Sequence, residues 1–264
     1  MLKVAIAGAR GKMGTEAVHT MMKKDNVELV AALDYKELGN TLAELPNFPT
    51  DYKIPIYTNI ITLIEETKPD VLIDLTNPHS VYEHTKIALQ HNVRPVVGTT
   101  GFTDEQISEL QELSKNSGTG CIIAPNFAIG AILMMKFAKE AAKYLPDVEI
   151  IEMHHEQKLD APSGTGIKTA QMIAETREQK TQGHPQEKET HVGARGADFE
   201  GMRIHSVRLP GLVAHQQVLF GGEGQLLTIR HDSFNRQSFM GGIAYCVDEV
   251  MNLKHLVYGL ENLI

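Results

Sequence analysis

Apolar runs alternate with amphipathic segments over residues 1–125, and this alternation is the clearest pattern in the chain. The runs are short and bounded by glycine, proline or polar residues, which predicts buried strands at Leu2–Ala7, Val27–Leu33, Val71–Leu75, Pro95–Val97 and Gly120–Ile123. The segments between them predict helices at Gly14–Lys24, Ile60–Glu66, Ser80–Gln90 and Thr103–Leu113, the last opened by the capping-box spacing of Thr103 and Gln106. Strands that alternate with helices favour a parallel sheet built from right-handed βαβ units.

The pattern changes in the second half of the chain. Helical periodicity at Ala131–Tyr144 and Gly164–Thr176 flanks a long strand, Val148–His154, and a polar loop follows at Lys180–Gly201. Three strands separated by glycine-rich turns then come at Met202–Arg208, Val213–Phe220 and Leu226–His231, which predicts a mixed or antiparallel sheet. The final segment, Gly241–Leu263, is predicted to be helical.

Charge and cysteine content narrow the class of protein. The formal net charge is −8 and no run of lysine and arginine is present, which argues against nucleic-acid binding as the main role. No apolar stretch approaches the roughly 18 residues that span a bilayer. The apolar run Val4–Ala7 is too short for a signal peptide core. Cys121 and Cys246 form no CxxC pair, which excludes a zinc site of cysteines and suits reduced, buried thiols. We therefore expect a cytoplasmic protein.

Three glycines follow the first strand and open the first helix. Gly8, Gly11 and Gly14 form GxxGxxG, and Asp34 ends the second strand twenty positions past Gly14. Glycine lets the backbone approach a pyrophosphate, the helix N-terminus supplies N–H groups, and a carboxylate at Asp34 would accept from the adenosine ribose. The spacing differs from the usual GxGxxG, and a tight turn without a ligand, with Asp34 as a loop carboxylate, is the alternative. The context favours a dinucleotide site.

The choice between NADH and NADPH stays open at this point. Asp34 favours NADH because its charge repels a 2′-phosphate, whereas Arg10, Lys12 and Lys36 could offset that charge. We expect use of both cofactors. Two loops at strand ends, Gly98–Gly101 and Ala124–Phe127, are where the nicotinamide and its ribose should lie, because ligands of open α/β sheets bind at the carboxyl ends of strands.

The run from Glu152 to Gly166 concentrates the candidate chemistry. A strand delivers His154 and His155, then Lys158, and Ser163-Gly164-Thr165-Gly166 opens a helix whose N–H groups suit a carboxylate. Neighbours on a strand point to opposite faces, so a metal held by both histidines is disfavoured and no metal is expected. Either histidine could instead be structural, and Lys158 could be a solvated surface charge.

These motifs resemble one enzyme family along essentially the whole chain. The chain is similar to 4-hydroxy-tetrahydrodipicolinate reductases, also called dihydrodipicolinate reductases. Its most specific matching motif is His-His-x-x-Lys-x-Asp-Ala-Pro-Ser-Gly-Thr, within Glu152–Thr165. The other matching segments are Val4–Gly14, Val97–Phe102, Ala124–Phe127, Gly193–Gly196, Ile204–Arg208 and Asn235–Phe239.

The resemblance implies an NAD(P)H-dependent oxidoreductase of the diaminopimelate pathway of lysine biosynthesis, with a cyclic dicarboxylate as substrate. It implies an α/β fold: a Rossmann domain at 1–126, completed by a C-terminal helix at 240–264, and a substrate and tetramerisation domain at 127–239 with an open mixed sheet. His154 matches the family's proton donor and acceptor, and Lys158 its second proton donor. The implied substrate contacts are His155, Gly164 and Thr165, to which the helix start adds Ser163. The implied cofactor contacts are Gly8, Ala9, Arg10, Gly11, Lys12, Met13, Asp34, Gly98, Thr99, Thr100, Ala124, Pro125, Asn126 and Phe127.

Two departures and two alternatives remain. Some members carry Glu-Arg where this chain has Asp34-Tyr35, which leaves cofactor preference in doubt, and Glu156-Gln157 replaces more basic residues of some members. The alternative enzyme is a related two-domain Rossmann dehydrogenase that acts on an amino acid or sugar alcohol. A non-catalytic nicotinamide sensor is the other class, although such a sensor would not need His154, His155 and Lys158.

Overall fold

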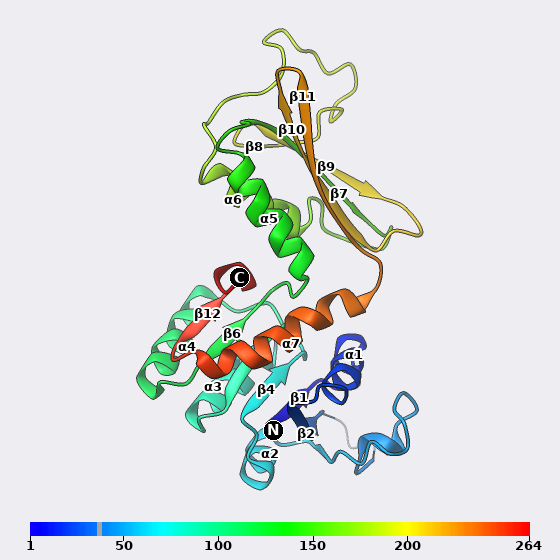
Figure 1. The fold of residues 1–264 in the computed structure, drawn as a ribbon. Helices are drawn as coiled ribbons and strands as arrows, with labels where there is room; N and C mark the ends of the chain where they lie inside the picture. The colour runs from blue at the N-terminus through cyan, green and yellow to red at the C-terminus, as the bar shows by residue number, and fades with distance from the viewer. Residues whose placement is uncertain (36–38) are drawn as a thin grey trace. The chain divides into compact units, whose positions relative to one another are not determined.

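The computed structural model describes residues 1–35 and 39–264, and these divide into two compact units. The first unit comprises Met1–Ala128 with Phe239–Ile264, and the second comprises Ile129–Ser238 (Figure 1). The chain therefore enters the second unit from the first and returns to the first before it ends.

The first unit is built on a seven-stranded parallel sheet. Its strand order is β12-β6-β5-β4-β1-β2-β3. The strands are β1 (Leu2–Ala7), β2 (Val27–Leu33), β3 (Ile56–Tyr57), β4 (Val71–Asp74), β5 (Arg94–Val97), β6 (Cys121–Ile123) and β12 (Leu256–Tyr258). The helices are α1 (Lys12–Met21), α2 (Ile60–Thr67), α3 (Val81–Gln90), α4 (Asp104–Ser117) and α7 (Met240–Glu249). Central strands such as β4 are buried along their full length, which is why they appear in the sequence as continuous apolar runs.

Among the described residues, two apolar clusters hold helices of the first unit on its sheet. One joins α2 to β1, β2 and β4 through side chains such as Leu33, Leu63 and Leu72. The other joins α3 and α4 to β5 and β6 through side chains such as Leu110 and Ile123. Helix α4 begins at a complete capping box, in which the Thr103 hydroxyl accepts from the Gln106 N–H and the Gln106 side chain accepts from the Thr103 N–H. The predicted capping box is confirmed.

The second unit is a five-stranded mixed sheet with two helices. The strand order is β11-β10-β7-β9-β8. The elements are α5 (Ile129–Ala141), β7 (Asp147–His154), α6 (Gly164–Ala174), β8 (Ala197–Phe199), β9 (Met202–Arg208), β10 (Ala214–Gly222) and β11 (Gln225–Ser233). Strand β7 is central, parallel to β9 and antiparallel to β10, and it buries alternate residues, including Val148, Ile150 and Glu152. Glu152 is thus a charged residue at a position that the pattern of the strand assigns to the core.

The predicted fold class is confirmed, with two corrections to the elements. The helix predicted at Gly241–Leu263 is wrong beyond Glu249, because a short 3₁₀ turn follows and Leu256–Tyr258 forms β12, paired with β6. Pairing with the sheet satisfies the backbone of this apolar segment, which overrides its local periodicity. The predicted loop Lys180–Gly201 contains β8, which pairs with β9. No helix in the described part of the chain is long and apolar enough to cross a membrane.

Candidate active site

The turn between β1 and α1 depends on close backbone contacts. Gly8 has φ +81°, and a Cβ there would lie 2.7 Å from the carbonyl oxygen of Leu75. A Cβ at Gly14 would lie 2.0 Å from the carbonyl oxygen of Gly8. No side chain caps α1 at Gly11, so N–H groups of its first turn are available to an anion. The turn therefore provides the narrow backbone cradle that a pyrophosphate requires.

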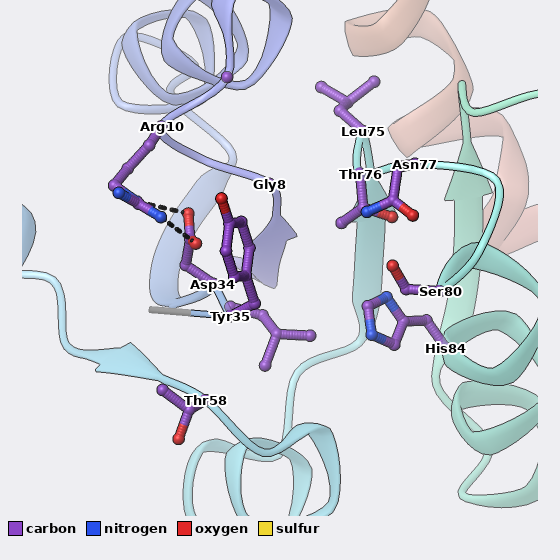
Figure 2. A pocket seen from close by; sticks show the side chains of 12 residues that line it. Gly8, Arg10, Asp34, Tyr35, Thr58, Leu75, Thr76, Asn77, Ser80 and His84 are labelled. Atoms are coloured by element: carbon purple, nitrogen blue, oxygen red, sulfur yellow. Dashed lines mark hydrogen bonds and ion pairs between the residues drawn. The ribbon is translucent and has the colours of Figure 1, made fainter. Parts of the chain in front are cut away.

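A cavity of about 420 Å³ lies beside this turn (Figure 2). It sits where the strand order reverses, between the carboxyl ends of β1 and β4, which is the usual ligand position in an open α/β sheet. Of the predicted cofactor residues it includes Gly8, Arg10, Gly11 and Asp34. The remaining lining residues are Leu33, Tyr35, Thr58, Leu75, Thr76, Asn77, Ser80 and His84. Ala9 is buried and Lys12 is exposed, and Lys36 lies outside the described residues.

Arg10 and Asp34 form a two-pronged ion pair in this cavity (Figure 2). Arg10 Nε donates to Asp34 Oδ2 at 2.7 Å, and Arg10 Nη2 donates to Asp34 Oδ1. The hydrogen bond to Asp34 raises the pKa of Arg10 above its ordinary value. The guanidinium also lies 5.7 Å from the ring centre of Tyr35. The carboxylate expected to meet the ribose is thus already charge-paired.

A second cavity, of about 400 Å³, shares Leu75 and Thr76 with the first. The predicted residues that line it are Met13, Gly98, Thr99, Thr100, Pro125, Asn126 and Phe127. Pro78 and Phe239 complete it, whereas Ala124 is buried beside it. Both loops predicted from the sequence, Gly98–Gly101 and Ala124–Phe127, thus contribute residues to this cavity, and Met13 of α1 lines it as well.

The second unit holds the other candidate residues around Glu152. This carboxylate has no exposed surface, and His154, two residues along β7, places Nδ1 2.5 Å from its Oε2. Arg208, at the end of β9, donates to both oxygens, at 2.9 and 2.8 Å. Burial alone would raise the pKa of Glu152, but hydrogen bonds from His154, Arg208 and Ser206 outweigh it and lower the pKa to about 2.

The start of α6 is tied to the same carboxylate. The Ser163 N–H donates to Glu152 Oε1 at 3.1 Å, and the Ser163 hydroxyl accepts from the Gly166 N–H at 3.1 Å. The Ser163 side chain is therefore engaged as the helix cap. Within the described ranges, the N–H groups of Gly164 and Thr165 have no hydrogen-bond partner. An anion at this helix start would thus meet backbone N–H groups, and the Ser163 hydroxyl keeps its own hydrogen to donate.

Lys158 and His155 lie outside the Glu152 cluster. Lys158 Nζ contacts Asp160 Oδ1 at 2.7 Å, and this hydrogen bond lowers the pKa of Asp160. His155 follows the end of β7 and is exposed. The two adjacent histidines therefore have different surroundings. Over residues 1–35 and 39–264, no group of three or more histidine, cysteine, aspartate or glutamate side chains could hold a metal.

Comparison with known proteins assigns both units to one family. The family model described as "Dihydrodipicolinate reductase, N-terminus" matches residues 2–127, and "Dihydrodipicolinate reductase, C-terminus" matches residues 130–264. A protein of Lysinibacillus sphaericus named 4-hydroxy-tetrahydrodipicolinate reductase is 75% identical over 100% of this chain and 99% of its own length. The chain belongs to the dihydrodipicolinate reductase family. Membership of this reductase family implies a nicotinamide cofactor, and the glycine turn with its adjoining cavities fits one.

Solved structures support the family and the fold. The dipicolinate-bound dihydrodipicolinate reductase from Paenisporosarcina sp. TG-14 is 65% identical, with a TM-score of 0.93 and complete coverage of both chains. An amine dehydrogenase from Mycobacterium smegmatis, at 13% identity and a TM-score of 0.69 over 97% of this chain and 94% of its own, shares the fold alone. A shared fold at this low identity assigns no activity to the chain.

Sequence reasoning missed a buried carboxylate beside the two cavities of the first unit. Asp74 is 1% exposed at the end of β4. Its Oδ1 accepts from the Thr76 N–H at 3.0 Å, the Thr76 hydroxyl at 2.6 Å and the Thr99 hydroxyl at 3.3 Å, and its Oδ2 lies 2.8 Å from His84 Nδ1. The signal was available, because Asp74 ends an apolar strand of the dinucleotide-binding pattern, as Asp34 follows one.

Removing Asp74 should weaken cofactor binding. In Asp74→Ala, the Thr76 and Thr99 loops lose their shared acceptor, and buried unsatisfied donors cost about 1–3 kcal/mol each. We expect the Kd for NADH, measured by fluorescence titration, to rise by about tenfold. Asp70→Ala is the matched control, because Asp70 accepts from the Lys3 N–H at the opposite end of β4 and lines neither cavity. Equal affinities in both variants would contradict this role for Asp74.

The low pKa of Glu152 predicts a dependence of stability on pH. The ordinary pKa is 4.5 and the folded value is about 2, so the carboxylate stabilises the fold above about pH 4.5, and this contribution disappears as the pH falls toward 2. It amounts to about 3 kcal/mol. Urea unfolding at about pH 6 and about pH 3.5 should show a smaller difference in Glu152→Gln than in the wild type. The exposed neighbour Glu156 supplies the control Glu156→Gln, and an unchanged dependence in Glu152→Gln would count against the assignment.

Proposed function

We propose that this chain is a 4-hydroxy-tetrahydrodipicolinate reductase that uses NADH or NADPH. The reaction adds one hydride and one proton to the cyclic dicarboxylate and releases water, giving tetrahydrodipicolinate for the diaminopimelate route to lysine. The observation that carries the proposal is the arrangement around Glu152. Its carboxylate contacts both the ring of His154 and the backbone N–H of Ser163 at the start of α6. It occurs in a chain that matches named reductases along its whole length.

The first unit is proposed to bind the cofactor, which supplies the hydride. The α1 N-terminus and Gly8 receive the pyrophosphate, because the glycines form a narrow backbone cradle there and no side chain caps the N–H groups of the first turn of α1. The cavity with Asp34 takes the adenosine, and the cavity between Gly98–Thr100 and Ala124–Phe127 takes the nicotinamide end. We propose domain limits of 1–126 with 240–264 for the cofactor and of 127–239 for the substrate, with Phe127 of the second cavity at the boundary.

The second unit is proposed to bind the substrate and to supply protons. His154 has the ring nitrogen Nε2 left over from its contact with Glu152, and a histidine suits proton transfer near neutral pH. Lys158 supplies a second proton or stabilises developing negative charge. The N–H groups of Gly164 and Thr165 receive one substrate carboxylate, and His155 contacts the substrate from the loop after β7.

The pairing of Arg10 with Asp34 supports the proposed use of both NADH and NADPH. The paired carboxylate keeps lone pairs that can accept from a ribose hydroxyl, while Arg10 compensates its charge and can meet a 2′-phosphate.

A homotetramer in the cytoplasm is the proposed state of the enzyme. Leucines on the outer strand β11, Leu226 and Leu227, remain exposed and are consistent with a buried role in an assembly.

The decisive experiment uses substrate generated by the preceding synthase and compares kcat/KM with NADH and NADPH. Consumption of either cofactor, with competitive inhibition by dipicolinate, supports the proposal. Turnover of an amino acid or sugar alcohol without inhibition by dipicolinate would assign a related dehydrogenase. Binding of NADH without turnover of the synthase product would indicate a sensor.

Lys158→Ala should lower turnover while leaving cofactor affinity unchanged. Loss of a positioned proton donor costs about 10²–10⁴-fold in rate. The matched control is Lys180→Ala, because Lys180 also belongs to the second unit and also pairs with an aspartate at 2.7 Å, in this case Asp147. Steady-state kcat and the NADH Kd are the measurements. Near-normal turnover in Lys158→Ala would show that the role assigned to Lys158 is wrong.

Arg10→Ala should change cofactor preference in favour of NADH. Without the guanidinium, the uncompensated charge of Asp34 repels a 2′-phosphate, while the carboxylate remains free to accept from ribose hydroxyls. The ratio of kcat/KM for NADPH to that for NADH should fall by about tenfold, which is about 1.4 kcal/mol. Lys23→Ala, which removes an exposed cation of the same unit that lines neither cavity, serves as the control. An unchanged ratio in Arg10→Ala would separate Arg10 from cofactor choice.

A further inference from the structure

We infer that Glu152 is a positioning residue that selects the Nδ1–H form of His154 and fixes the spacing between this proton donor and the anion-binding start of α6. The inference rests on the proposed function for its kinetic part only. It concerns a side chain that does not itself touch the substrate.

The tautomer follows from the chemistry of the contact. An ionised carboxylate only accepts hydrogen bonds, and the pKa of about 2 keeps Glu152 ionised at neutral pH. Oε2 lies 2.5 Å from His154 Nδ1, so the proton of the neutral imidazole must be on Nδ1. Nε2, on the opposite side of the ring, is then the nitrogen that gains and releases a proton. A histidine whose second nitrogen is held by a carboxylate has a defined orientation as well as a defined tautomer.

Arg208 stabilises the buried charge of Glu152. A carboxylate without exposed surface is costly unless it is paired and hydrogen-bonded. The guanidinium donates to both oxygens, and the β7–β9 register places Arg208 directly opposite His154. Because Arg208 compensates the charge in either state of the ring, His154 can release its second proton without leaving an unpaired buried carboxylate.

The other oxygen carries the geometric part of the inference. Oε1 accepts the Ser163 N–H at 3.1 Å, directly before the free N–H groups of Gly164 and Thr165. One rigid carboxylate therefore contacts the proton donor at Oε2 and the helix start at Oε1. The planar geometry of the Glu152 carboxylate therefore sets the distance between His154 and a substrate carboxylate bound at the start of α6. Catalysis by orientation requires such distances to be fixed.

An amide cannot replace this carboxylate without changing the ring. In Glu152→Gln, the NH₂ group must face either His154 Nδ1 or the Ser163 N–H, and Arg208 donates to both positions. Keeping the Ser163 contact turns the NH₂ toward the ring, so Nδ1 must accept and the proton moves to Nε2. The neutral histidine then carries its proton on Nε2, so this nitrogen can no longer accept one.

The test begins with the wild-type protein. Nitrogen-15 NMR of histidine-labelled enzyme, with His154 assigned by the loss of its signals in His154→Asn, should show neutral His154 as the Nδ1–H tautomer. Glu152→Gln should show the Nε2–H tautomer, with kcat lowered by about 10²–10⁴-fold and the NADH Kd unchanged. Glu152→Asp keeps an acceptor-only group and should retain the Nδ1–H tautomer and recover part of kcat.

The chain contains a matched control on the same strand. Glu149 also pairs with a histidine and an arginine, His205 at 2.8 Å and Arg195 at 2.6 Å, and it lies outside the Glu152 cluster. Glu149→Gln should keep kcat within about threefold of the wild type, since this half-buried carboxylate contacts neither His154 nor the start of α6. The double variant Glu152→Gln with His154→Asn should be no slower than His154→Asn alone, because residues that act as a unit are not additive.

The outcomes separate this inference from the proposed function. An Nε2–H tautomer in the wild type overturns the positioning role even if Glu152→Gln fails to fold. Where Glu152→Gln folds, a further loss of rate in the double variant overturns it as well. An inactive wild type with the Nδ1–H tautomer overturns the reductase function and leaves the role of Glu152 in orienting the ring supported.

Discussion

The second unit depends on one buried charge. Glu152 lies in the core-facing row of β7, where Val148 and Ile150 are its neighbours, and such a carboxylate requires several donors to be stable. Those donors come from β7 itself, from the end of β9 and from the start of α6. The three elements that carry the candidate chemistry are therefore held together by the same requirement, and stability and geometry have a common origin.

The first unit uses a related arrangement. Asp74 ends β4 as a buried carboxylate, and it joins the loop after its own strand to the loop after β5 and to His84 on α3. The close backbone approach of Gly8 to Leu75 lies beside it. In both units, a hydrogen-bond network at the end of a parallel strand fixes the neighbouring loops, and such preorganisation would favour ligand binding at the proposed sites.

Much of this architecture was predictable from local pattern. Buried parallel strands such as β4 are continuous apolar runs, and the glycine turn, Asp34 and the loops at Gly98 and Asn126 follow from the rule that ligands bind at carboxyl ends of strands. Other features were not predictable, because they depend on partners distant in sequence. Arg208 lies 56 residues from Glu152, and the pairing of Arg10 with Asp34 depends on the side-chain conformations of two strand ends. The sequence of β12 has no local pattern that distinguishes a strand from a helix. Its pairing with β6 makes this segment a strand.

The route of the chain has a consequence for biosynthesis. Strand β12 completes the sheet of the first unit beyond β6, and α7 packs so closely that a Cβ at Gly242 would lie 1.9 Å from the carbonyl oxygen of Phe127. Both elements are made after residues 129–238, so a ribosome finishes the second unit while the first still lacks an edge strand and a covering helix. Contacts between residues so distant in sequence form slowly. The nascent protein must therefore keep β6 and the surface under α7 from aggregating until translation reaches the final strand.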